Sequence, residues 1–194
     1  MEYPLHVSFK IMTFGSKFTV TDNNGNVLFY VKQKLFKLKE KINVFSDTTQ
    51  TNQLYTIGAD RIIDFSARYN FTDMNGQNLG SIKRKGMKSL FRANYEIYDG
   101  ENQVMSITEE SVFVRFMDAI FSSIPCIGVC SGYVFHPSYL VARLDGTEMM
   151  RVKKQPAFFE GKFKIEKLNE MSDYEEKQIL LSIMMMLLLE RIRG

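Results

Sequence analysis

Hydrophobic and polar residues alternate in short segments over most of the chain, and Asn-Gly or Asp-Gly pairs separate many of these segments. The stretch "FTVTDNNGNVLFYVKQK" at 18–34 is repeated as "YNFTDMNGQNLGSIKRK" at 69–85, and looser copies follow at 95–110 and 140–154. The glycine of such a pair supplies the positive φ that a tight hairpin turn requires. Each copy therefore predicts a β-hairpin, and the whole pattern predicts ten or more short antiparallel strands between about residues 5 and 168.

The end of the chain has a different pattern, "ILLSIMMMLLLERIRG" at 179–194. Ser172 and Glu175 form a capping-box signature, with acidic residues in the first turn and arginines in the last, so a helix is predicted at about 173–192. Residues 179–189 are apolar except for Ser182, so the helix has no polar face and must be surrounded. A bilayer span needs about 20 apolar residues. The shorter run favours a helix enclosed by the sheet, and a membrane anchor is the alternative.

Closure of the sheet into a barrel would remove its exposed edges and enclose this helix. The 194 residues, 45% of them hydrophobic, suit one domain spanning 1–194. The formal net charge of +3 does not by itself indicate a nucleic-acid partner. Two cysteines and no signal-peptide pattern predict a cytoplasmic location. Phosphate-binding glycine loops are missing from the sequence, so we expect no nucleotide cofactor.

The succession "FTVTDNNGNVLFYVKQKLFKLKEKINVFSD", "LGSIKRKGMKSLFRANYEIYDG", "FFEGKFKIEKL" and the apolar C-terminal helix resembles the LURP-one-related family of Tubby C-terminal-like proteins, which are relatives of phospholipid scramblases. The resemblance implies a mostly β fold: a closed antiparallel barrel of about twelve strands around a central hydrophobic C-terminal helix. It also implies a binding role, because Tubby domains bind phosphoinositides through basic surface residues. The ligand residues of Tubby cannot be matched to positions in this chain, and no calcium segment like that of the scramblases is present.

Basic residues cluster at equivalent positions of the successive hairpins. We expect them to collect at one end of the barrel, where they would face anionic headgroups; each lysine near an anionic surface contributes about 1 kcal/mol. The alternative is that these lysines discourage strand pairing at edges and keep the turns soluble. The candidate ligand-binding residues are Lys32, Lys34, Lys83, Arg84, Lys85, Lys88, Arg92, Lys153 and Lys154.

The segment 112–138 departs most from the repeated pattern. Its first half, 112–124, has the spacing of an amphipathic helix, which would cover an opening of the barrel or dock on a membrane or a protein partner. Cys130 lies in a G-x-C-x-G motif near His136, yet no third group that would orient this histidine is identifiable. Cys126, Cys130 and His136 are one ligand short of a structural zinc site. We therefore expect neither catalysis nor a bound metal there.

These observations predict a non-catalytic binding or scaffolding module that recognises anionic phospholipid headgroups at the periphery of a membrane. The alternative is a protein-interaction or self-associating barrel that never meets lipid and presents the segment 112–138 to its partner. The sequence also predicts a surface ion-pair cluster of Asp60, Arg61, Asp64 and Arg68.

Overall fold

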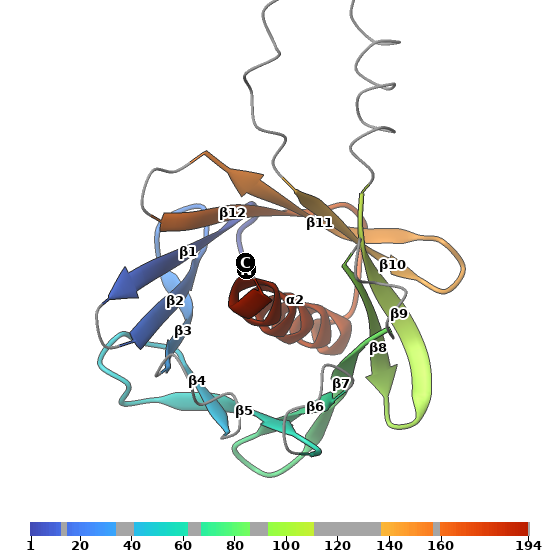
Figure 1. Ribbon diagram of the computed structural model, residues 1–194, viewed down its shortest axis with the longest axis horizontal. Coiled ribbons are helices and arrows are strands. Elements are labelled where there is room, and N and C mark those ends of the chain that lie inside the picture. Colours follow the sequence, from blue (N-terminus) through green and yellow to red (C-terminus); the bar gives the residue numbers. More distant parts are fainter. Residues whose placement is uncertain are drawn as a thin grey trace, which may run out of the picture.

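The computed structural model describes residues 1–12, 15–33, 41–61, 67–85, 93–110, 137–156 and 160–193. Twelve antiparallel strands form a closed barrel, in which each strand pairs with its neighbours in the chain and β12 returns to pair with β1 (Figure 1). The strands are Leu5–Met12 (β1), Gly15–Thr21 (β2), Val27–Gln33 (β3), Ile42–Phe45 (β4), Gln53–Ala59 (β5), Arg68–Asp73 (β6), Asn78–Arg84 (β7), Asn94–Asp99 (β8), Asn102–Glu109 (β9), Ser138–Arg143 (β10), Glu148–Gln155 (β11) and Glu160–Lys167 (β12). The predicted fold class is confirmed.

Side chains alternate between the interior and the outer face along each strand, because successive residues of a strand point to opposite faces. In β1, Leu5, Val7 and Phe9 are buried, whereas His6 and Lys10 are exposed. The aromatic residues at one end of β1, β2 and β12 meet inside the barrel: the Phe9 ring lies 4.5 Å from that of Phe18 and 6.1 Å from that of Phe163, between ring centroids. The register of each strand is thus fixed by an apolar inner face.

The repeated Gly-containing segments form the predicted hairpins with one recurring turn geometry. Gly25, Gly76 and Gly146 have φ values of +84°, +79° and +90°. Each donates its backbone N–H to the carbonyl three residues earlier, and the strand register shifts beside each turn. A tight turn followed by a left-handed glycine and a bulge is a common hairpin connection. The fourth, weaker copy also forms a hairpin, β8–β9, with Gly100 at φ +57°.

The helix α2, Asp173–Arg193, runs through the barrel interior (Figure 1). All residues from Gln178 to Leu188 are buried, including Ser182, whose hydroxyl donates to the Gln178 carbonyl at 2.7 Å. The predicted capping box is present, since Glu175 N–H donates to Ser172 Oγ and Ser172 N–H donates to Glu175 Oε2, both at 3.2 Å. The apolar tail is therefore core. Within the described residues, no helix is both long enough and apolar enough to cross a membrane.

The helix packs tightly against the sheet at a glycine of β7. Gly80 has φ +102° and is buried, and a Cβ atom added there would lie 2.2 Å from Gln178 Nε2 and 2.6 Å from the Tyr98 carbonyl oxygen. Gln178 Nε2 donates to that carbonyl at 3.2 Å. Only a residue without a side chain fits this conformation and this approach. Gly80 therefore determines how closely α2 packs against β7.

Polar contacts fix the N-terminal end of α2. The Arg143 guanidinium of β10 binds both carboxylate oxygens of Glu175 at 3.0 Å, and the Tyr3 hydroxyl donates to Glu176 at 2.8 Å. Burial raises the pKa of Tyr3, and the hydrogen bond to Glu176 and its charge raise it further. A bidentate Arg–carboxylate pair is among the stronger polar contacts in proteins. The helix is thus attached to β10 and to the N-terminal residues before β1.

Candidate functional site

The predicted basic residues of the repeated hairpins that the structure describes lie toward one end of the barrel but are distributed around its circumference. Lys32, Lys83 and Lys153 lie toward the C-terminal ends of β3, β7 and β11, which run in the same direction in the antiparallel barrel. These strands are separated from one another by three intervening strands, so the three lysines occupy different sides of the barrel. Lys34, Lys88 and Arg92 lie outside the described residues. The equivalent hairpin positions therefore do not form one compact cluster among the residues that the structure describes.

Arg84 does not lie on the outer surface, contrary to its place in the predicted anion-binding set. Its side chain points into the barrel and is 8% exposed, and its guanidinium lies 3.5 Å from a carboxylate oxygen of Glu190 on α2. The guanidinium also lies 5.6 Å from the centroid of the Tyr95 ring, and the Tyr95 hydroxyl donates to the same Glu190. Burial raises the pKa of Tyr95, and the hydrogen bond to Glu190 raises it further. The inward position of Arg84 follows from the alternation of side chains along β7. Ile82 faces inward, and Arg84, two residues later, lies on the same face of the strand.

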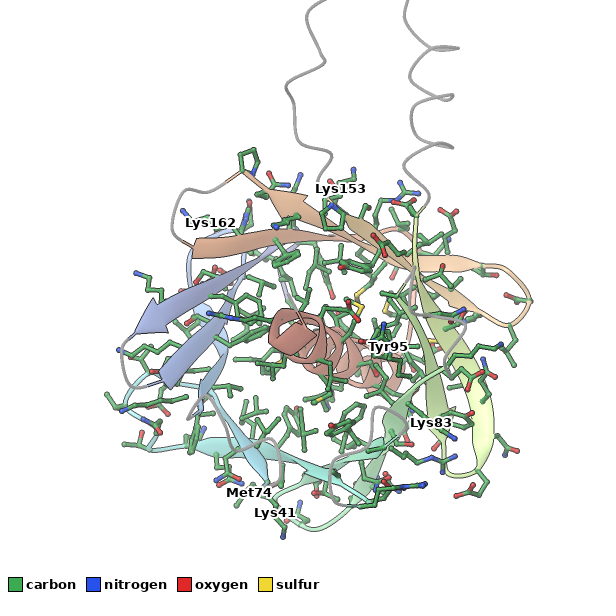
Figure 2. The ribbon with its side chains drawn as sticks, in the orientation of Figure 1. Lys41, Met74, Lys83, Tyr95, Lys153 and Lys162 are labelled. Carbon is green, nitrogen blue, oxygen red and sulfur yellow. The ribbon has the colours of Figure 1, made fainter. Side chains whose placement is uncertain are left out.

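Lys83 and Lys85 face outward beside acidic side chains. Lys83 is opposite Glu96 in the pairing of β7 with β8, and the Lys85 ammonium lies 3.4 Å from Glu96 Oε1. Figure 2 shows Lys83 on the outside of the barrel and Tyr95 inside it. Opposite charges directly across a strand pair stabilise the sheet modestly. The charge of Lys85 is thus paired with Glu96, and Lys83 lies across the strand pair from the same carboxylate.

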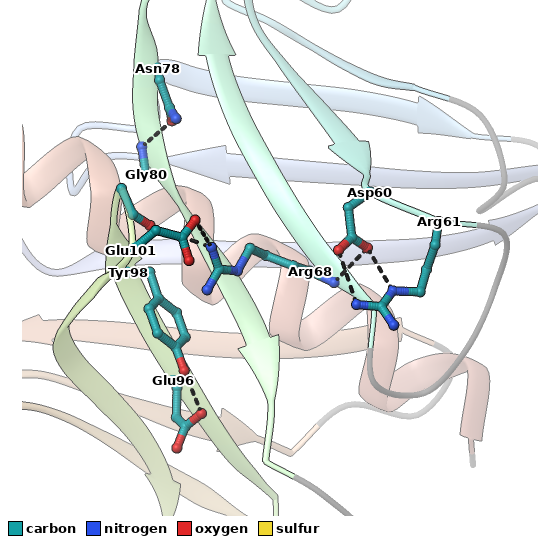
Figure 3. A network of polar contacts seen from close by, with 9 residues as sticks. Asp60, Arg61, Arg68, Asn78, Gly80, Glu96, Tyr98 and Glu101 are labelled. Atoms are coloured by element: carbon teal, nitrogen blue, oxygen red, sulfur yellow. Dashed lines mark hydrogen bonds and ion pairs between the residues drawn. The ribbon is translucent and has the colours of Figure 1, made fainter.

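The predicted ion-pair cluster around Asp60 is present in part. Arg61 lies 3.3 Å from Asp60, but the Arg68 guanidinium turns away from Asp60 and pairs with Glu101 at 2.8 Å (Figure 3). The Arg68 guanidinium also lies 4.4 Å above the centroid of the Tyr98 ring, and the backbone N–H of Arg68 donates to Asp60 at 3.0 Å. Asp64 lies outside the described residues. We refer to Arg68, Lys85, Glu96 and Glu101 as the paired wall.

A larger group of lysines lies on the outer face of five adjacent strands. We refer to it as the basic wall; it consists of Lys153 on β11, Lys162 and Lys164 on β12, Lys10 on β1, Lys17 on β2 and Lys32 on β3. Figure 2 shows Lys153 and Lys162 projecting from the outside of β11 and β12. The inner faces of the same strands carry buried residues such as Phe9 and Phe18, so the alternation of each strand directs the lysines outward.

The lysines of the basic wall differ in their counter-charges. Glu166 bridges two of them, with Oε2 at 2.9 Å from Lys153 Nζ and Oε1 at 3.0 Å from Lys164 Nζ. The hydrogen bonds with Lys153 and Lys164 lower the pKa of Glu166. Lys10 takes part in another interaction, and Glu160 is opposite it in the register of β1 and β12. Across the described part of the chain, Lys17, Lys32 and Lys162 form no hydrogen bond or ion pair.

The comparison with protein families supplies the identity of this barrel. The model of the LURP-one-related family matches residues 29–166, which is most of the chain and extends from β3 into β12. The chain belongs to the LURP-one-related family. The family resemblance predicted from the sequence is thereby confirmed.

The solved structures that this LURP-one-related chain resembles include the X-ray structure of a protein from Arabidopsis thaliana. The sequence identity is 19%, the TM-score is 0.47, and the match covers 93% of this chain and 89% of the Arabidopsis chain. No curated protein matches the chain. These comparisons therefore assign a family to the chain and leave its ligand to be inferred from the site.

Four residues of the basic wall were missed in the sequence: Lys10, Lys17, Lys162 and Lys164. They occur singly or as alternate residues in three separate strands, and only the pairing of β12 with β1 brings them together. The alternating "KFK" at 162–164 was the available signal, because alternate residues of a strand share a face. The other candidate groups, Cys126, Cys130, His136 and the predicted helix 112–124, lie outside the described residues. Within those residues, no group of three or more His, Cys, Asp or Glu side chains is arranged to hold a metal ion.

Proposed function

We propose that this LURP-one-related barrel is a non-catalytic binding module that docks on an anionic phospholipid surface through the basic wall. The observation that carries the proposal is the excess of lysines over carboxylates on five adjacent strands, in contrast to the paired wall. A surface with an excess of positive charge is attracted to anionic membranes.

The size of the charge excess is sufficient for membrane association. Lys17, Lys32 and Lys162 each contribute one uncompensated positive charge, and Lys153 and Lys164 together retain one after pairing with Glu166. At about 1 kcal/mol per charge near an anionic surface, these four charges supply roughly 4 kcal/mol, or about a thousandfold in partitioning. Ionic screening reduces this attraction, so docking is expected to weaken as salt is added.

Co-sedimentation with lipid vesicles tests the proposal. The wild-type protein should bind vesicles that contain phosphatidylglycerol, should not bind phosphatidylcholine vesicles, and should bind more weakly as salt rises. The triple variant Lys17→Glu, Lys32→Glu and Lys162→Glu should lose more than about a hundredfold in affinity, because removing three attractive charges alone costs about 3 kcal/mol and the new carboxylates repel the membrane.

A matched control separates the position of the charges from the net charge. Arg61→Glu, Lys83→Glu and Lys85→Glu change the net charge by the same amount, at exposed or half-buried positions at the ends of β5 and β7, outside the basic wall. This variant should retain most of the binding. Equal losses in the two triple variants would contradict docking through the basic wall, and the failure of the wild-type protein to bind any anionic vesicle would contradict the proposed function.

A further inference from the structure

Three lysines of the basic wall lie in one row across neighbouring strands. Lys10 is directly opposite Lys17 in the pairing of β1 with β2, and Lys17 is directly opposite Lys32 in the pairing of β2 with β3. Directly opposed residues of antiparallel strands have Cβ atoms about 4.5–5.5 Å apart, and like charges in such pairs destabilise the sheet. The row therefore holds several positive charges close together at a cost in stability.

Another pair of directly opposed lysines lies on β11 and β12, and a carboxylate contacts both of its members. Lys153 and Lys164 are directly opposite each other in the pairing of β11 with β12. Glu166 gives one carboxylate oxygen to each ammonium, at 2.9 Å and 3.0 Å. One anionic group with two separate oxygens thus satisfies both lysines. The Lys17–Lys32 pair has the same cross-strand relation, but no carboxylate contacts either ammonium in the described residues.

We propose that Lys17 and Lys32, with Lys10 beside them, bind the phosphomonoester group of a membrane lipid. The inference rests on the proposed function and names the chemical class of the ligand. A phosphomonoester has three terminal oxygens and a charge of about −1.5 to −2 at pH 7, so one group can accept hydrogen bonds from both ammonium groups, as Glu166 does for the other pair. Charge-assisted N–H···O bonds of about 2.7–2.9 Å on either side of one phosphate span a distance similar to that between opposed strand residues.

A phosphodiester headgroup fits the row less well. It has two free oxygens and a single charge, and its second ester substituent occupies one side of the phosphate. A phosphodiester could reach two lysines through its two free oxygens, as Glu166 does, but its single charge would leave more of the row's positive charge uncompensated. The phosphomonoester therefore gains more from the cross-strand arrangement. The row also lies on the convex outer face of a barrel, where a small soluble ligand would be held on one side only, whereas a bilayer presents many phosphates to the whole face.

The test compares phosphatidic acid, a phosphomonoester lipid, with phosphatidylglycerol, a phosphodiester lipid, in vesicles adjusted to equal zeta potential. We expect the wild-type protein to bind the phosphatidic acid vesicles about fivefold more tightly. Lys32→Gln should abolish this preference. Lys162→Gln, which removes one charge from the same wall outside the row, should weaken binding to both vesicles equally and keep the preference.

A charge-conserving variant tests the arrangement itself. Lys32→Thr combined with Thr19→Lys keeps the net charge and the number of lysines on the wall, but it moves the second ammonium from β3 to β2, two residues from Lys17. This variant should bind phosphatidylglycerol vesicles as the wild-type protein does and should lose the preference for phosphatidic acid.

The outcomes distinguish this inference from the proposed function. Equal, salt-sensitive binding of the wild-type protein to both vesicles would overturn the phosphomonoester site and leave docking on anionic lipid intact. Lack of binding to either vesicle would overturn both proposals. Glycerol 3-phosphate serves as the soluble phosphomonoester; if it displaces the protein from phosphatidic acid vesicles at micromolar concentration, the ligand is soluble and the lipid-borne site is wrong.

Discussion

Both the basic wall and the paired wall carry cationic side chains, but the two walls differ in how many of these cations have a carboxylate partner. On the paired wall, Arg68 contacts Glu101 and the Tyr98 ring, and Lys85 contacts Glu96. On the basic wall, Glu166 serves two lysines while Lys17, Lys32 and Lys162 have no acidic partner in the described residues. The difference shows that the number of cations in a segment does not locate an anion site. Cations that lack a carboxylate partner within the fold are the better indicator of such a site.

Both walls depend on the stability of the barrel, so the largest effect is expected from a substitution that disrupts the packing of α2 inside it. Gly80→Ala is expected to lower the free energy of unfolding by about 3 kcal/mol or more, because the new Cβ would collide with Gln178 and the Tyr98 carbonyl at a positive φ. Urea denaturation followed by circular dichroism measures the loss.

The control for this substitution is Gly58→Ala on β5. A Cβ atom at Gly58 has no heavy atom within 4 Å and the backbone there is not left-handed, so the variant should be nearly as stable as the wild-type protein. If Gly80→Ala is tolerated as well as Gly58→Ala, the close packing of α2 against β7 is wrong.

A smaller effect is expected from neighbouring cations on the two faces of β7. Arg84→Met removes the cationic partner that β7 gives to Glu190 and should cost about 2 kcal/mol, since the partly buried carboxylate would lose that charge beside the C-terminal end of α2. Lys83→Met changes an outward-facing lysine and should alter stability by less than about 0.5 kcal/mol. Chemical denaturation of both variants provides the measurement. Similar losses for the two would contradict the inward orientation of Arg84.

The smallest effect concerns the carboxylate that compensates part of the basic wall. Glu166→Gln frees Lys153 and Lys164 and should strengthen binding to phosphatidylglycerol vesicles about fivefold. Glu101→Gln on the paired wall changes the net charge equally and should have little effect. If both substitutions strengthen binding to the same extent, net charge alone would account for the attraction.

The same carboxylate is expected to make stability depend on pH. Because Lys153 and Lys164 lower the pKa of Glu166 in the folded protein, its contribution is present above the pKa of the unfolded chain and is lost as the pH falls through the lowered value. The wild-type protein should therefore exceed Glu166→Gln in stability at pH 7 by less than about 1 kcal/mol. Urea midpoints of the two proteins should converge below about pH 4.

Much of the fold was predictable because its signals are local. Gly25 and Gly76 mark turns whose φ values only glycine adopts readily, and the repeated segments around them indicated hairpins before any contact was known. The apolar run of α2 has no polar face, so its location inside the barrel followed from its composition. Both predictions depend on residues close together in the chain.

The site was predictable only in part because it depends on pairings between distant segments. Lys32 was included in the predicted set, but its neighbour Lys17 joins it through the register of β2 with β3, and Lys162 joins them through closure of β12 on β1. Arg84 was assigned to the surface because basic residues were grouped by their place in the repeat. The two-residue period of β7, with Ile82 buried, would have placed Arg84 inside.

The position of α2 in the chain has a consequence for biosynthesis. The helix follows all twelve strands, and β1 pairs with β12, so the ribosome releases the barrel segments before the residues that fill them. Before Ile179–Leu188 emerge from the ribosome, no helix covers the inner faces of the strands. Their apolar side chains are then exposed to contact with other chains. Nascent barrels of this kind should therefore require chaperone protection during translation, and completion of the helix should convert them to the native state.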